Sequence, residues 1–171
     1  MLIAMDHGNK QCKLVRSEPF ISGLTESEVR PFGPYVLKYG DKYYQISDQR
    51  IPYRRDKTED DRFFILTLFG IANEIEASSA YAPGIIRVQL AVGLPPAHYG
   101  AQNAKFIQYF SGRGVVSFFY RDKPYSILID DVACYPQSYA AAASMLQTLT
   151  TVPLALVVDI GGYTMDYIRI K

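Results

Sequence analysis

An Asp-X-Gly sequence follows a short apolar run near each end of the 171-residue chain, as Asp6-His7-Gly8 and Asp159-Ile160-Gly161. Glycine has no Cβ, so the backbone N–H groups beside it can approach a phosphate group closely. Magnesium bound with a nucleotide is usually held by one or two carboxylates, by water and by the phosphates. Two such turns that face each other would bind a polyphosphate together with Mg²⁺.

The two Asp-X-Gly sequences are more informative as a pair than singly. Either one alone is common turn chemistry and is more often structural. Lys13 and Thr164, however, lie at matching positions just past the two turns. For Lys13 alone, the alternative is a solvent-facing lysine on a strand. The pair predicts two phosphate-binding hairpins.

Other sequence features exclude several classes of site. No Walker A sequence is present. Gly112-Arg113-Gly114 follows a predicted helix and opens a strand, which is the reverse of the order in dinucleotide-binding turns. His7 and His98 fit loop or surface positions and have no second metal ligand at a useful spacing. The two cysteines, Cys12 and Cys134, form no disulfide framework and indicate a reducing compartment.

The composition is that of one globular domain, with 49% hydrophobic and 20% charged residues. The formal net charge of +1 provides no general attraction for nucleic-acid phosphates, which disfavours direct DNA or RNA binding. The apolar runs at both ends are too short for a signal peptide or a membrane span, because Asp6 and Asp159 interrupt them. We therefore expect a cytoplasmic protein with no membrane partner.

Turn residues between short apolar runs predict four hairpins. Their strands are Leu2 to Met5 with Gln11 to Arg16, Tyr35 to Tyr39 with Tyr43 to Ser47, Val115 to Tyr120 with Tyr125 to Ile129, and Leu154 to Val158 with Thr164 to Ile170. Between the first two hairpins, Ser17 to Pro34 is polar and contains two prolines, which indicates an irregular or edge segment. The charged stretch Asp48 to Asp61 is expected to be a solvated loop.

Helices and one further strand complete the pattern. A helix over Phe63 to Ile75 is apolar on nearly every side and is expected to be buried. Ile85 to Val92 is rich in branched residues and predicts a central strand. A short helix over Asn103 to Phe110 and an alanine-rich helix from Pro136-Gln137 to about Leu149 follow. Hairpins that alternate with helices predict an α/β fold, a mixed sheet with flanking helices.

Three segments resemble one superfamily. Asp6 to Lys13 is similar to the first phosphate loop of the actin, Hsp70 and sugar-kinase superfamily, and Asp159 to Asp166 is similar to its second. Asp131 to Ala141, between them, resembles the connecting segment of the plasmid-segregation actin-like ATPases of the ParM type. The resemblance covers nearly the whole chain and is loosest over Ser17 to Asp61. It implies a ribonuclease H-like lobe of an actin-type ATPase.

The resemblance also implies roles for particular residues. Asp6 and Asp159 are expected to lie at a hydrated Mg²⁺, and Gln137 is expected to orient the attacking water. Glutamine is too weak a base to do more than orient that water. The alternative for Gln137 is a residue that only begins a helix. The residues expected to bind phosphate groups are Gly8, Asn9, Lys13, Gly161, Gly162 and Thr164.

The sequence departs from the family pattern at two positions, and the second lobe of the family fold is missing from it. Lys10 is bulky where many relatives have a small polar residue, and Tyr163 stands where a small residue is common. In this superfamily the nucleotide lies between two lobes, and the second lobe supplies most of the pocket for the base and ribose. Residues 1–171 are expected to form only the first, N-terminal lobe. This lobe alone is expected to bind nucleotide weakly and to be inactive.

The leading functional hypothesis is a filament-forming ATPase that hydrolyses ATP or GTP with Mg²⁺ and segregates plasmid DNA. Its expected partners are copies of itself and a DNA-binding adaptor protein. One alternative is a small-molecule kinase lobe of the same superfamily. Another is a non-catalytic module that uses some of its fourteen tyrosines to bind a partner. We expect most tyrosines in the core and the cluster from Arg50 to Lys57 in solvent.

Overall fold

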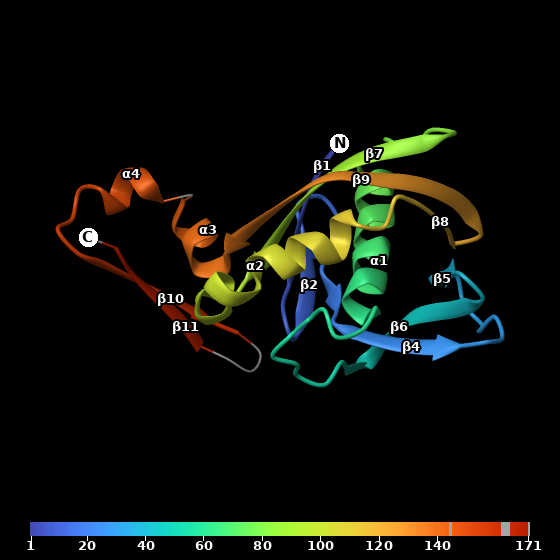
Figure 1. Cartoon of the computed structure of the whole chain (residues 1–171), viewed down its shortest axis with the longest axis horizontal. Helices are drawn as coiled ribbons and strands as arrows, with labels where there is room; N and C mark the ends of the chain where they lie inside the picture. Colours follow the sequence, from blue (N-terminus) through green and yellow to red (C-terminus); the bar gives the residue numbers. More distant parts are fainter. Residues whose placement is uncertain (144, 162–164, 171) are drawn as a thin grey trace.

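A nine-stranded mixed sheet forms the body of the molecule, and a separate two-stranded sheet follows it (Figure 1). The computed structural model describes residues 1–143, 145–161 and 165–170. In spatial order, the strands of the large sheet are β3 (Phe20–Ile21), β2 (Gln11–Leu14), β1 (Leu2–His7), β7 (Ile85–Leu94), β9 (Lys123–Pro136), β8 (Val115–Tyr120), β5 (Val36–Tyr39), β6 (Lys42–Arg50) and β4 (Gly23–Ser27). The small sheet pairs β10 (Ala155–Ile160) with β11 (Met165–Ile170).

The centre of the large sheet consists of three parallel strands, β1, β7 and β9. Parallel neighbours need a crossover, and helices α1 (Arg62–Ala77) and α2 (Pro96–Ser111) lie within the two crossovers. The remaining strands pair antiparallel. Two short helices, α3 (Gln137–Ala143) and α4 (Leu146–Leu149), lead from β9 to the small sheet. The predicted mixed sheet with flanking helices is confirmed, and so are the pairings of all four hairpins.

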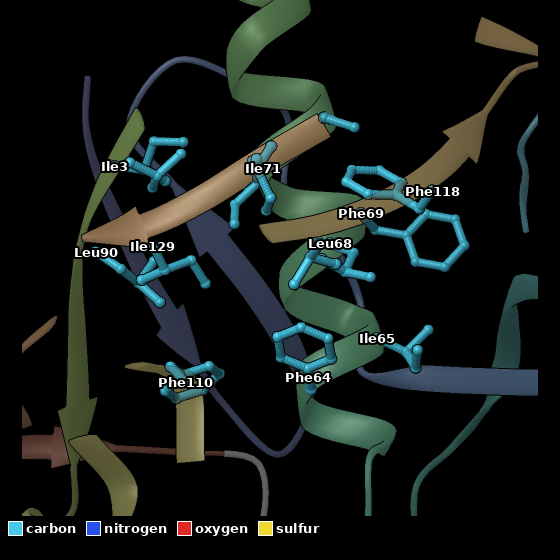
Figure 2. Close-up of a cluster of buried hydrophobic side chains, with 14 of the residues drawn as sticks. Ile3, Phe64, Ile65, Leu68, Phe69, Ile71, Leu90, Phe110, Phe118 and Ile129 are labelled. Carbon is cyan, nitrogen blue, oxygen red and sulfur yellow. The ribbon is translucent and has the colours of Figure 1, made fainter. Parts of the chain in front are cut away.

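The core lies between α1, α2 and one face of the sheet. Alternate residues of β7, namely Val88, Leu90 and Val92, are buried on that face. Figure 2 shows side chains of α1, including Phe64, in one cluster with strand residues such as Leu90 and Ile129. As predicted, α1 is buried on nearly every side. Intervening strand positions such as Asp6 and Gly93 are only partly buried.

Several element boundaries differ from the predictions. Helix α2 begins at Pro96, seven residues before the predicted start, because proline is well suited to a first helical turn, where its missing N–H costs nothing. The alanine-rich segment forms two helices, α3 and α4, with Met145 in a turn before α4. The polar segment Ser17 to Pro34 contains β3 and β4, which are the two edges of the sheet, so the edge interpretation is confirmed.

The prediction that most tyrosines lie in the core is wrong. Only Tyr44, Tyr120 and Tyr125 are buried among the described tyrosines. The strongly exposed ones are Tyr35, Tyr53, Tyr81, Tyr135, Tyr139 and Tyr167. A tyrosine ring can pack along its apolar body while its hydroxyl stays in water, so composition does not place it in the core. None of the helices in the described ranges is long and apolar enough to cross a membrane.

Candidate functional site

A cavity of about 480 Å³ lies between the β1–β2 turn and the end of β10. Most of the predicted site residues line this one cavity: Asp6, Gly8, Asn9, Lys13, Gln137, Asp159 and Gly161. Lys10, noted as a departure from the family pattern, lines it too. Gly162, Tyr163 and Thr164 lie outside the described residues. The fold therefore brings together residues that the sequence places about 150 positions apart.

Asp6 lies at the centre of the site. Its Oδ1 accepts a hydrogen bond of 2.5 Å from Gln137 Nε2. Lys13 is its direct partner across the β1–β2 ladder, with Nζ 3.8 Å from Asp6 Oδ2. Burial raises the pKa of Asp6, while the cations of Lys13 and Lys57 and the bond from Gln137 act in the opposite direction. Burial has the larger effect, and the nearby carboxylate of Asp159 adds to it, so the pKa of Asp6 lies above its ordinary value.

Gln137 is the first residue of α3, which follows β9 directly. Gly93 on the neighbouring strand β7 makes room for it, because a Cβ at Gly93 would lie 2.7 Å from Gln137 Cγ. Since the amide nitrogen of Gln137 donates to Asp6, the amide oxygen is the atom that could accept from a water molecule. From the sequence, Gly93 could be recognised as the end of a strand, but not as a contact of Gln137.

The turn after β1 is braced by β3 and its neighbours. Ser22 Oγ donates to the carbonyl of Gly8 at 2.5 Å, and Ser22 N donates to the carbonyl of Lys10 at 3.1 Å. A Cβ at Gly8 would lie 2.7 Å from the backbone oxygen of Gln11. Glycine is therefore required at position 8 by the close approach of the backbone, independently of any ligand.

His7 is not a surface residue, contrary to the sequence prediction. It is fully buried, and the rings of Phe63, Phe106 and Phe110 surround it. His7 Nε2 lies 2.7 Å from Thr67 Oγ1, and that hydroxyl donates to the carbonyl of Phe63. The hydroxyl oxygen then accepts from a protonated Nε2. Burial, aided by the nearby cation of Lys57, lowers the pKa of His7 to about 3, so the ring is neutral.

Lys57 departs from the predicted solvated loop. The residue is only 6% exposed, and its Nζ donates to the carbonyl of His7 at 2.5 Å. Nζ also lies 5.3 Å from the centre of the Phe63 ring. Burial lowers the pKa of Lys57, while the carboxylate of Asp6 has the opposite effect. Lys57 lines the same cavity as Asp6.

The second hairpin contributes a pair of carboxylates. Asp159 and Asp166 are direct partners across the β10–β11 ladder, and both line the cavity. Like charges directly opposite each other are unfavourable unless a cation lies nearby. In the ladder register, Asp166 and not Thr164 takes the position that Lys13 has opposite Asp6, so the predicted match of Thr164 to Lys13 is wrong.

The donor set of the cavity fits hydrated Mg²⁺ bound with a polyphosphate. Asp6, Asp159 and Asp166 provide carboxylate oxygens, and Lys13 provides a cation for phosphate. In the part of the chain that the structure describes, no group of three or more His, Cys, Asp or Glu could hold a metal ion by itself. A magnesium ion held largely through water and phosphate oxygens needs no such group.

Comparisons with known proteins give one family match and many structural matches. Residues 4–139 match the family described as the N-terminal domain of actin-like proteins. No curated protein sequence matches the chain significantly.

Three similar structures illustrate the shared fold. The archaeal actin homolog Ta0583 has 15% identity and a TM-score of 0.76, over 99% of this chain and 56% of that one. A 15-stranded ParM filament from Clostridium botulinum has 15% identity and a TM-score of 0.73, over 98% and 58%. An AlfA filament bound to AMPPNP has 13% identity and a TM-score of 0.71, over 98% and 63%. The chain thus spans little more than half the length of these relatives.

Proposed function

Because this chain belongs to the actin-like proteins, as their N-terminal domain, we propose that it is the first lobe of a nucleotide hydrolase that assembles into filaments. The proposed substrate is ATP or GTP with Mg²⁺. Residues 1–171 form one lobe in this proposal, and a second lobe supplies most of the pocket for the base and ribose. The AlfA structure with AMPPNP, a similar fold, supports a nucleotide as the ligand.

One observation carries the proposal. The hydrogen bond from Gln137 to Asp6 joins the expected water-orienting residue to the expected magnesium residue, inside a cavity whose other wall holds Asp159. This bond spans from the end of β9 to β1, two strands away, and so places the Gln137 amide at the cavity. The arrangement matches what hydrolysis of a bound polyphosphate requires, which is positioning more than acid–base strength.

The residues that line the cavity have different roles in the proposed reaction. Bound Mg²⁺ would neutralise the phosphate charge that develops as the terminal phosphoryl group departs. Asp6 and Asp159 would hold the hydrated ion, and the backbone at Gly8, Asn9 and Gly161 would bind the phosphate groups. The amide oxygen of Gln137 orients the attacking water, since its nitrogen is already held by Asp6.

Assembly and partners follow from the same proposal. Other copies of the protein are the partners in the filament, as in the similar ParM and AlfA filaments. The formal net charge of +1 gives little attraction for DNA, so a DNA-binding adaptor would link the filament to a plasmid. The proposed setting is the bacterial or archaeal cytoplasm, without a membrane partner.

The test is Mg²⁺-dependent hydrolysis of ATP and GTP by the full-length protein over a range of concentrations, with light scattering recorded in parallel. We expect turnover and scattering to rise together above a critical concentration. Gln137→Ala should lower turnover about 10- to 100-fold with nucleotide affinity retained. Gln147→Ala, at an exposed position of α4, is the matched control.

Two results would contradict the proposal. Turnover that requires an added hydroxylated substrate would indicate a small-molecule kinase. A full-length protein that binds neither nucleotide would leave only the role of an interaction module.

A further inference from the structure

Lys57 is a buried cation in a segment whose other charged residues are mostly at the surface. Removing an ammonium group from water is costly unless a ligand or counter-charge repays that cost. The partners of Lys57 in the described structure are the neutral carbonyl of His7, the face of the Phe63 ring and the field of Asp6. A neutral donor would serve the carbonyl of His7 equally well. The position of the charge therefore calls for a further explanation.

The side chain of Lys57 lies where two cavities meet. It lines the cavity that contains Asp6, and it lines a neighbouring one beside Tyr53 and the start of α2. An ammonium group has three N–H donors, of which the carbonyl of His7 accepts one. The cation thus lies against the turn that carries Gly8 and Asn9, with donor capacity left for a ligand.

We propose that Lys57 is a cation of the polyphosphate site: it binds a phosphate oxygen of the nucleotide while its bond to His7 holds the first phosphate-binding turn. This inference rests on the proposed function, because it names a further residue of that site. The substrate class is a nucleoside triphosphate or diphosphate, as opposed to a monophosphate or a nucleoside.

Charge and burial both favour this role. Four cationic side chains, Lys10, Lys13, Arg50 and Lys57, line the cavity together with three acidic ones, Asp6, Asp159 and Asp166. Lys13 is well exposed, with 63% of its side chain accessible, and must lose rotamer freedom when it binds. Lys57 is already held in place, and its charge acts through a less polar medium than water. It is therefore the better preorganised of the two lysines.

The decisive experiment measures dissociation constants of MgATP, MgADP and AMP by calorimetry on the full-length protein. For Lys57→Met we expect MgATP affinity to fall about 10- to 100-fold, the factor for one charged hydrogen bond. MgADP should lose less and AMP nothing. Lys57→Arg, which keeps the charge, should retain most of the affinity. Lys38→Met removes a charge on β5, away from the cavity, and should bind as the wild type does.

The outcomes separate the inference from the proposed function. Equal affinities for Lys57→Met and the wild type would overturn the inference and leave the proposed function standing. Equal losses for all three ligands would also overturn it, since they would indicate a structural role. A wild-type protein that binds none of the ligands would overturn both. If Lys57→Met does not fold, Lys57→Gln decides, because it keeps a donor for His7 without the charge.

Discussion

The two hairpins that carry the Asp-X-Gly sequences have similar functional groups but differ greatly in how they are packed against the rest of the molecule. The β1–β2 hairpin lies inside the large sheet, with His7 and Cys12 fully buried and its turn held by Ser22 and Lys57. The β10–β11 hairpin is a sheet of its own, and its apolar side chains such as Ile160 are largely exposed. The β1–β2 hairpin is thus part of the central sheet, whereas the β10–β11 hairpin is positioned mainly through contacts with α3 and α2.

The largest contrast is expected in stability. Ile3 is fully buried, so Ile3→Ala in the 171-residue chain should lower the free energy of unfolding by about 3 kcal/mol. Val158 is 46% exposed, so Val158→Ala should cost less than about 1 kcal/mol. Urea denaturation of both variants makes the comparison. Similar losses would mean that the second hairpin is as well supported as the first.

The second contrast concerns catalysis by the full-length protein. Asp6→Asn should lower kcat by at least about 100-fold, because it removes a charge that also orients Gln137 and faces two lysines. Asp159→Asn should have a smaller effect, since Asp166 lies directly opposite and can hold part of the cation's water shell. Steady-state kinetics at saturating Mg²⁺ measures both. A larger loss for Asp159→Asn would reverse our assignment of the principal carboxylate.

Glu74 tests how the first hairpin is anchored. Its buried carboxylate on α1 accepts hydrogen bonds from the backbone of Arg16 and Ser17, just after β2. Although burial raises the pKa of Glu74, these bonds outweigh it and lower the pKa below the ordinary 4.5. The bonds therefore stabilise the fold fully above pH 4.5, and their contribution is lost as the pH falls through the lower folded value.

The matching variant is Glu74→Gln. It should cost about 2 kcal/mol of unfolding free energy at pH 7, and the difference from the wild type should shrink below pH 4.5. Denaturant titrations between pH 7 and pH 3 measure that difference. Glu18→Gln, at an exposed position, should change stability very little. A difference that stays constant with pH would disprove the ionic character of this anchor.

The smallest effect is expected at Gly93, which gives Gln137 its place beside the first hairpin. Gly93→Ala would force the Gln137 side chain to move, because the new Cβ would lie 2.7 Å from its Cγ. We expect kcat to fall about tenfold with KM nearly unchanged, as for loss of one positioning contact. Gly100→Ala on α2 is the control, since a Cβ at position 100 would have no atom within 4 Å beyond its chain neighbours and the backbone of its own helix. If kcat and KM are the same for the two variants, Gly93 does not help to position Gln137.

The fold was predictable where local chemistry decides it. Turn residues such as Gly40 identified the hairpins, and the apolar run from Phe63 identified the buried helix. The start of α2 was missed because Pro95 and Pro96 suit both a loop and a first helical turn. The burial of His7 could have been found from the alternation of Ile3, Met5 and His7 along β1.

The site was predictable only in part. The residues of the two Asp-X-Gly turns and Gln137 could be named because each lies in a recognisable local sequence. Lys57 lies in no such sequence, and the place of Gly93 at the end of a strand does not reveal its contact with Gln137. Both roles arise from strands and loops that meet only in the folded molecule. A charged run in a loop says nothing about which of its cations becomes desolvated.

The parallel arrangement of β1, β7 and β9 also has a consequence for how the protein folds. The bond between Asp6 and Gln137 joins residues 131 positions apart, and it can form only after both crossovers have closed. Contacts of such long range make folding slow, because chain entropy is lost before they are gained. A partly folded chain therefore lacks the complete proposed nucleotide site, and a nucleotide bound there would stabilise only molecules in which the central sheet is already assembled.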